Sequence, residues 1–117
     1  MIRSLKIYSE KEMKLINTPL KGLIIVQPKV FEDVRGYFFE SYSKKELTTA
    51  GIDAEFVQDN QSQSQKNVLR GLHFQNPPHA QGKLVRVLKG AVLDIAVDIR
   101  KNSPTYGQHV AEVLSAK

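Results

Sequence analysis

The chain has 117 residues, of which 41% are hydrophobic and 25% charged, close to the usage of ordinary globular domains. This length fits one domain with a real core and leaves little room for a second. The net charge of +5 comes from 17 basic and 12 acidic residues. Because these charges are scattered rather than gathered in a block, we expect a small anionic ligand and no nucleic acid. The chain has no cysteine, which excludes disulfides and thiolate ligands.

Targeting and membrane signals are not found in the sequence. The longest apolar run, residues 23–26, is far shorter than a bilayer crossing requires, so no membrane span is expected. Residues 1–14 contain no uncharged apolar block followed by a cleavage site, which argues against a secretory signal. A cytoplasmic protein is the default expectation.

Two strands are predicted in the first third of the chain. Residues 22–27 form a β-branched apolar stretch that ends at Pro28, and this pattern is typical of a strand. Residues 36–42 carry four aromatic side chains, which favour a pleated surface. Between the two strands, residues 31–36 (FEDVRG) have the composition of a turn.

One short helix is predicted after the second strand. Ser43 fits a helix N-cap, and Glu46 stands three residues later as its capping-box partner. Gly51 follows the last expected turn, where glycine commonly ends a helix. The helix is therefore expected over residues 44–50.

The second half of the chain predicts a β-hairpin and a further strand. Residues 83–88 and 92–99 are both strand-like, and a Lys-Gly pair breaks the pattern between them. The second strand alternates with a period of two, with Leu93, Ile95, Val97 and Ile99 on one face and Asp94, Ala96 and Asp98 on the other. Residues 100–108 are a loop by composition, and 110–114 begin another strand. Short strands with frequent turns predict an all-β antiparallel sandwich or jelly-roll barrel.

The run VLRGLHFQ at residues 68–75 is the strongest candidate for a functional site. It follows FVQDN and precedes QGKL, so His73, Arg70 and Lys83 stand close together in sequence. Histidine is the usual base near neutral pH, a developing enolate needs a cation, and guanidinium binds phosphate well. These residues favour a site that removes a proton next to a carbonyl while it holds an anionic substrate.

Several motifs together carry a family resemblance: KLINTPLKGLIIVQPKVFEDVRGYFFESY, FVQDNQSQSQKNVLRGLHFQ and AQGKLVRVLKGAVLDIAVDIRKNSPTYGQ. Over residues 14–115 the chain resembles the dTDP-4-dehydrorhamnose 3,5-epimerases, with the motifs in the family's order and spacing. The resemblance implies a cupin-like antiparallel jelly-roll barrel with one short helix, a homodimer, and neither metal nor organic cofactor. It also implies a substrate, dTDP-4-dehydro-6-deoxy-D-glucose, whose C3′ and C5′ are inverted in dTDP-L-rhamnose biosynthesis.

The resemblance assigns a role to each matched residue. His73 corresponds to the catalytic base, and Lys83 to a substrate-contacting position where its cation can steady the enolate oxygen. Both inverted carbons are α to the C4′ ketone, so each can lose a proton to a base and regain one on the opposite face. The other matched positions bind the nucleotide part of the substrate: Arg35 and Arg70 the diphosphate, Glu40, Gln58 and Asn60 the nucleotide, and Phe38 the thymine ring.

Each of these residues also has a structural interpretation. A histidine in a strand-rich segment can simply be packed or solvated, and Lys83 can be a solvated strand end. Arg35 can close a turn, and Arg70 can pair with a carboxylate. Hydrogen bonding and packing are the alternative for Phe38, Gln58 and Asn60, and a structural role is expected for Asp94 and Asp98.

Metal binding is not expected. Jelly rolls that hold a metal commonly do so through His-x-His with a carboxylate and a later histidine. Here Phe74 and Gln75 follow His73, and the remaining histidines, His79 and His109, have no paired spacing.

The resemblance also sets expectations for the two ends. Residues 1–12 are expected to be an N-terminal extension, and 13–117 the N-terminal portion of the epimerase domain. Family members continue past the equivalent of Lys117, with a tyrosine proposed as the opposite-face acid, a further histidine and an aspartate that orients the base. Full epimerase activity of these 117 residues alone is therefore expected to be impaired.

Two other functions share the same motifs. A related dTDP-sugar 3-epimerase or ketoisomerase would use the same base but exchange protons at a different set of carbons. A non-catalytic nucleotide-sugar-binding fragment would bind dTDP and exchange neither proton.

Overall fold

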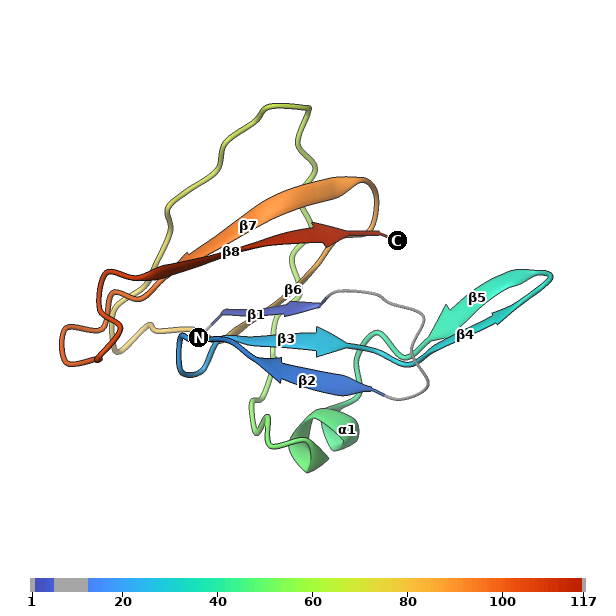
Figure 1. Cartoon of the computed structure of the whole chain (residues 1–117), viewed down its shortest axis with the longest axis horizontal. Coiled ribbons are helices and arrows are strands. Elements are labelled where there is room, and N and C mark those ends of the chain that lie inside the picture. The colour runs from blue at the N-terminus through green and yellow to red at the C-terminus, as the bar shows by residue number, and fades with distance from the viewer. Residues whose placement is uncertain (1, 6–12, 117) are drawn as a thin grey trace.

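The computed structural model describes residues 2–5 and 13–116. Within them the strands form a four-stranded sheet and two separate two-stranded ribbons (Figure 1). The elements in chain order are β1 (Ile2–Leu5), β2 (Lys14–Asn17), β3 (Ile24–Gln27), β4 (Val30–Asp33), β5 (Gly36–Phe39), α1 (Lys44–Thr49), β6 (Lys83–Arg86), β7 (Ala91–Val97) and β8 (His109–Ser115). The predicted β-rich architecture with one short helix is confirmed.

The four-stranded sheet has the order β2-β3-β1-β6. β2 pairs antiparallel with β3, whereas β1 pairs in parallel with both of its neighbours. β3 corresponds to the strand predicted over residues 22–27. β1 belongs to the expected extension at residues 1–12, of which residues 1 and 6–12 lie outside the described part of the chain.

The helix α1 and the β7–β8 ribbon cover opposite faces of the four-stranded sheet (Figure 1). On the helix side, Val26 of β3 packs with Leu47 of α1 and with Ile52, and all three are buried. A second cluster joins the other side of the sheet to the ribbon through Leu20, Leu23 and Ala96. Among the side chains that the structure describes, the core therefore consists of two small clusters, one on each side of the sheet.

Helix α1 forms where the capping signal lies. Ser43 is extended, and its Oγ accepts a hydrogen bond from the backbone N–H of Glu46, with an N···O distance of 3.3 Å. The prediction of a helix over 44–50 is confirmed except for Ala50, which is the C-cap. Gly51 follows with a φ of +88°, in the left-handed region that glycine adopts easily. No helix in the described part of the chain is long and apolar enough to span a membrane.

The β-hairpin predicted between residues 83–88 and 92–99 is wrong. β6 pairs with β1, whereas β7 pairs antiparallel with β8, the strand predicted over 110–114. The Lys-Gly turn carries the chain from the sheet to the ribbon instead of folding it back on itself. β8 offers β7 a partner along its whole length, which the four-residue β6 cannot.

The period of two predicted for β7 is confirmed, and its two faces differ in exposure. Leu93 and Ile95 are exposed, whereas Ala96 and Asp98 are buried and Asp94 is half-buried. The face with smaller and polar side chains thus meets the four-stranded sheet. The apolar face has no covering layer within the described residues.

The turn predicted over residues 31–36 is only partly correct. Residues up to Asp33 belong to β4, so the turn narrows to Val34 and Arg35 before β5 begins. β5 also ends at Phe39, earlier than the predicted boundary at 42. The β4–β5 hairpin projects from one end of the molecule (Figure 1).

Residues 53–82, between α1 and β6, contain neither strand nor helix. His73 therefore lies outside the strands, in a segment for which no strand was predicted. A strand needs a neighbour for its backbone groups, and no strand within the described residues pairs with this segment. The segment arches away from the sheets (Figure 1), and the radius of gyration of 15.0 Å exceeds the value of about 13 Å expected for a compact domain of this length.

Asp98 anchors the loop that follows β7, and only 1% of its side chain is exposed. Its Oδ1 accepts hydrogen bonds from the backbone N–H and Nε of Arg100, and its Oδ2 from the hydroxyls of Ser103 and Thr105. Nη1 of Arg100 donates to the carbonyl of Lys21 at 2.9 Å, which ties this loop to the turn before β3. These hydrogen bonds, above all those from Arg100, hold the pKa of Asp98 well below its usual range.

We expect the substitution Asp98→Asn to remove an acid-sensitive part of the stability. The folded-state pKa lies below the ordinary value of 3.8, so the carboxylate stabilises the fold above that pH and this contribution is lost as the pH falls. Urea unfolding should give a lower midpoint for Asp98→Asn than for the parent near neutral pH, and the gap should narrow toward about pH 3. Asp53→Asn, at an exposed position, is the matched control. A gap that is constant with pH would contradict this role.

Candidate active-site surface

The eight residues predicted for the site lie on three parts of the chain, and all are exposed. They are Arg35, Phe38 and Glu40 on or next to the β4–β5 hairpin, Gln58, Asn60, Arg70 and His73 in residues 53–82, and Lys83 at the start of β6. In Figure 1 the hairpin projects at one end while residues 53–82 arch away from it. The structure therefore groups these residues within each part but does not bring the hairpin and the His73 segment together.

Arg35 lies in the hairpin turn and is engaged by Asp33. The backbone N–H of Arg35 donates to Oδ1 of Asp33 at 2.8 Å, and its guanidinium donates to both carboxylate oxygens. The side-chain bonds, and to a lesser degree the backbone bond, lower the pKa of Asp33. The side-chain bonds also raise the pKa of Arg35. Sequence reasoning missed Asp33, although the same Asp-x-Arg spacing recurs at Asp98 and Arg100 and signals this kind of turn.

An open cleft of about 400 Å³ follows the same hairpin and is lined by Phe31, Glu32, Asp33, Arg35, Gly36, Tyr37 and Phe38. The rings of Phe31 and Phe38 have centroids 6.4 Å apart, and Nζ of Lys29 lies 4.8 Å from the Phe31 centroid. Small-molecule sites have volumes of roughly this size. Aromatic faces beside a guanidinium suit a flat base attached to an anion.

Arg70 is held by neutral oxygens inside its own segment. Its Nε donates to Oγ of Ser64 at 2.8 Å, and its Nη2 donates to the carbonyl of Gln63 at 3.1 Å. The alternative that Arg70 pairs with a carboxylate is therefore not observed within the described residues. Gln58 and Asn60 contact each other, with Nε2 donating to Oδ1 at 3.1 Å.

His73 and Lys83 are the two residues predicted to be catalytic. Within residues 13–116, no other side chain or backbone group is observed to orient either of them. Both side chains are exposed, so the alternative of a packed histidine does not hold. Within residues 13–116 neither side chain has a hydrogen-bond or ion-pair partner. A catalytic imidazole needs a second group that fixes its orientation. In the described part of the chain, no group of three or more His, Asp or Glu side chains is placed to hold a metal.

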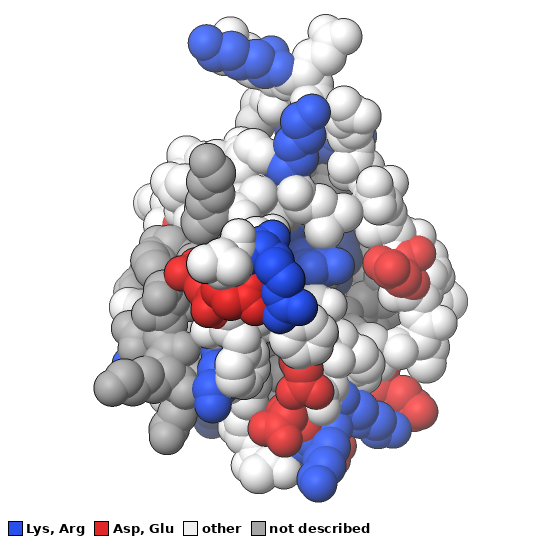
Figure 2. Space-filling model, turned by 90° about the vertical axis from the view of Figure 1, so that its right-hand side faces the viewer, with Lys and Arg blue, Asp and Glu red and all other residues white. Residues whose placement is uncertain are grey.

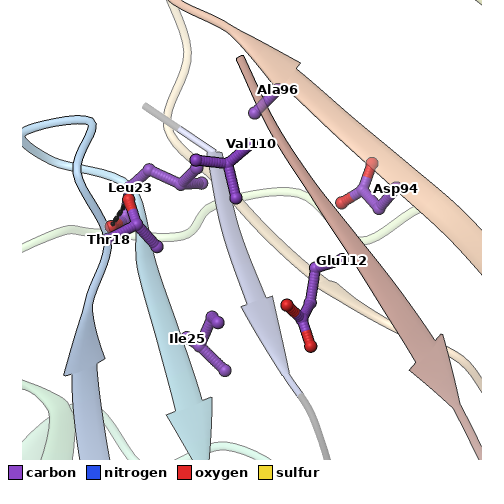
Figure 3. A pocket seen from close by; sticks show the side chains of 7 residues that line it. All are labelled: Thr18, Leu23, Ile25, Asp94, Ala96, Val110 and Glu112. Carbon is purple, nitrogen blue, oxygen red and sulfur yellow. Dashed lines mark hydrogen bonds between the residues drawn. The ribbon is translucent and has the colours of Figure 1, made fainter.

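A separate small cavity lies between the β7–β8 ribbon and the four-stranded sheet (Figure 3). Asp94 and Glu112 are opposite each other in the ribbon register and both point toward it. Its volume of about 10 Å³ leaves room for about one water molecule. It contains none of the eight predicted site residues. Glu112 was not predicted from the sequence, although alternation along β8 places it on the same face as Val110.

Basic and acidic side chains are interspersed on the end of the molecule where the hairpin lies (Figure 2). This agrees with the scattered charges of the sequence. No continuous basic stripe of the kind that follows a nucleic-acid backbone is seen on this face.

A sequence model of one protein family, described as dTDP-4-dehydrorhamnose 3,5-epimerase, matches residues 17–117. The match covers most of the chain and includes all eight residues predicted for the site. The chain belongs to the dTDP-4-dehydrorhamnose 3,5-epimerase family. The resemblance found in the sequence motifs is thus confirmed.

Relatives of the same name are similar along most of this chain. The dTDP-4-dehydrorhamnose 3,5-epimerase of Salmonella typhimurium strain LT2 is 56% identical over 106 residues, which are 90% of this chain and 58% of that protein. The epimerase of Methanothermobacter thermautotrophicus is 50% identical over 104 residues, 89% of this chain and 56% of the relative. The chain therefore spans less than two thirds of the length of these relatives.

Solved structures of family members share the fold. The epimerase of Elizabethkingia anophelis NUHP1 has a TM-score of 0.81 at 53% identity, covering 90% of this chain and 58% of its own. The Legionella pneumophila enzyme, solved in complex with dTDP-4-keto-L-rhamnose, has a TM-score of 0.84 at 53% identity, with coverages of 90% and 56%. The Bacillus anthracis enzyme, with TDP and PPi bound, has a TM-score of 0.85 at 48% identity, with coverages of 89% and 60%. The predicted cupin-like jelly-roll class is confirmed by this agreement.

Proposed function

We propose that this chain carries the proton-abstracting part of a dTDP-4-dehydrorhamnose 3,5-epimerase acting on dTDP-4-dehydro-6-deoxy-D-glucose. The observation that carries the proposal is the family match over residues 17–117, which includes His73, Arg70 and Lys83. The proposal also divides the chain into an extension at 1–12 and a family domain from 13 onward, and a family match that begins at residue 17 is compatible with this division. No organic cofactor or metal is required by the chemistry assigned to these residues.

The proposed reaction uses acidity that the substrate already has. The C–H bonds at C3′ and C5′ are α to the C4′ ketone, so a base that removes either proton leaves an enolate. The imidazole of His73 is the base, and the ammonium of Lys83 stabilises the negative charge on the enolate oxygen. Exchange of either proton with solvent needs only these two groups. Inversion also needs an acid on the opposite face of the sugar.

The dTDP part of the substrate is assigned to cationic and aromatic side chains. Arg70 suits the diphosphate because only neutral oxygens contact its guanidinium among the described residues. In the hairpin cleft, Arg35 supplies a second guanidinium and Phe38, 67% exposed, supplies an aromatic face for the thymine. Glu40, Gln58 and Asn60 are assigned hydrogen bonds to the nucleotide.

We expect His73→Ala to abolish solvent exchange at the sugar. The parent chain, incubated in deuterated water with dTDP-4-dehydro-6-deoxy-D-glucose, should incorporate deuterium at C3′ and C5′, as read by NMR. Without the base the rate should fall about 10²- to 10⁴-fold, whereas affinity for dTDP should stay nearly unchanged. His79→Ala, an exposed histidine of the same segment, is the matched control and should retain exchange.

The same measurement separates the alternative functions. Exchange at C3′ alone would identify a 3-epimerase, and dTDP binding without exchange at either carbon would identify a binding fragment. A His73→Ala variant that exchanges at the parent rate would remove His73 from the role of base.

We expect Arg70→Ala to weaken dTDP binding roughly tenfold, because a charge-assisted, bidentate contact with the diphosphate is lost. Isothermal titration calorimetry with dTDP measures the change. Lys66→Ala, an exposed cation in the same segment, is the control and should bind dTDP nearly as the parent does. Equal losses in both variants would indicate general attraction to positive charge instead of a specific Arg70 contact.

We also propose that the protein is a homodimer. The proposal rests on the separation of the predicted site residues between the β4–β5 hairpin and the His73 segment. The hairpin exposes Tyr37 and Phe38, and the other segment exposes Leu69, Leu72 and Phe74, each by more than 60%. Exposed large apolar side chains grouped in this way within each part commonly mark a protein interface. A second copy can place its hairpin against the His73 segment of the first, which joins the two halves of the site.

A mixing experiment tests this arrangement. Copies with His73→Ala and copies with Arg35→Ala are each expected to be defective in solvent exchange at the sugar at low substrate concentration. If the hairpin serves the partner's site, an equal mixture after refolding should restore about a quarter of the sites, because each mixed dimer keeps one intact site. A mixture no more active than the average of the two variants would contradict shared sites. Sedimentation velocity on the parent chain gives the oligomeric state independently.

A further inference from the structure

The strand β1 occupies an unusual place for a segment outside the family domain. The family match begins at residue 17, yet Ile2–Leu5 lies inside the four-stranded sheet, between β3 and β6 (Figure 1). Its register runs from Arg3↔Ile24 to Leu5↔Val26 on one side and from Ile2↔Lys83 to Leu5↔Arg86 on the other. β1 is therefore paired along both edges, and it is parallel to both neighbours.

The two strands beside β1 form a gap of one strand width. β3 and β6 do not pair with each other, since β1 stands between them in the sheet order. Without β1, each would present a row of unpaired backbone N–H and C=O groups to the other. Such edges are templates for the addition of an extended segment.

Both walls of this gap are held in place by contacts that do not involve β1. Ile24 of β3 and Leu84 of β6 pack against the same buried cluster of Val26, Leu47 and Ile52. The helix side of the core therefore connects the two walls beneath the gap. A strand that enters finds edges that are already positioned.

We propose that the gap between β3 and β6 is a strand-acceptor site for an extended peptide in parallel orientation. Its occupant is the segment Ile2–Leu5, and the site takes this segment from a separate molecule as well as from its own chain. The register of β1 is carried by main-chain pairing, and main-chain pairing does not depend on a covalent link to the acceptor. A second copy of the chain supplies the identical segment, so exchange between two copies closes a symmetric pair.

In the first test, the substitution Ser4→Pro prevents β1 from pairing in the gap between β3 and β6. A separate peptide with the β1 sequence is then added. Proline has no N–H and is not tolerated in a strand paired on both sides. Hydrogen exchange should accelerate at the amides of β3 and β6 in Ser4→Pro, while those of β7 and β8 stay protected. Ser4→Ala keeps the N–H and is the matched control, with exchange like the parent.

A labelled peptide with the sequence of residues 1–6 should bind Ser4→Pro and restore protection in β3 and β6. Fluorescence anisotropy should show that the peptide binds the parent chain at least roughly tenfold more weakly than it binds Ser4→Pro. In the parent chain, β1 itself occupies the site most of the time. A peptide with proline at its fourth position should not bind. Unchanged exchange in β3 and β6 of Ser4→Pro, or equal binding of both peptides, would overturn the proposal.

A second measurement introduces no proline into β1. It tests strand exchange between copies even if the Ser4→Pro variant does not fold. The chain has no cysteine, so every disulfide joins two introduced cysteines, and the pair of unlike chains is told from pairs of like chains by mass. Ser4 is in register with Val85, and adjacent strands are about 4.8 Å apart, within the reach of a disulfide. Chains with Ser4→Cys mixed with chains with Val85→Cys, refolded and oxidised, should give disulfide-linked pairs. The control mixture uses Lys89→Cys, and an equal yield from both mixtures would refute exchange between copies.

Discussion

Backbone pairing is the constraint on which the rest of this structure depends. A strand is stable only where its N–H and C=O groups meet a neighbouring strand, and each described strand has such a neighbour. Residues 53–82 have none, and they run without regular structure although they carry His73 and Arg70. The availability of partner strands, more than the local sequence, therefore decides where the catalytic candidates stand. It also explains why their side chains are exposed in a single chain.

The parts of the fold that were predictable are those set by neighbours in sequence. The cap at Ser43 and the alternation along β7 each depend on a few adjacent residues, and the structure shows both. The partner of a strand is set by residues far away, which a periodic pattern does not identify. This is why the Lys-Gly turn suggested a hairpin, while β7 pairs with β8 and β6 with a strand from the expected extension.

The candidate site divides in the same way. Residue type and motif identified His73, Arg70 and Lys83, because the chemistry of imidazole, guanidinium and ammonium is intrinsic to the side chain. What surrounds each group was not predictable: Asp33 on Arg35 and Ser64 on Arg70 are contacts made by local folding of a turn and a loop. Asp98 was treated as one residue of a strand face, whereas burial makes it the acceptor for an entire loop.

Holding residues 68–75, which contain His73, in one conformation has a cost in conformational entropy that other interactions must offset. Fixing the backbone of residues 68–75 in one conformation costs about 8–16 kcal/mol, at 1–2 kcal/mol per residue. A micromolar dissociation constant corresponds to about 8 kcal/mol, which is the net value that remains after such ordering costs have been met. Covering what remains exposed of Val68, Leu69, Leu72 and Phe74 would contribute about 4–8 kcal/mol. Burial of these four side chains against protein surface would therefore offset a large part of the cost of holding the His73 segment in one conformation, and a segment ordered in advance would bind substrate more tightly.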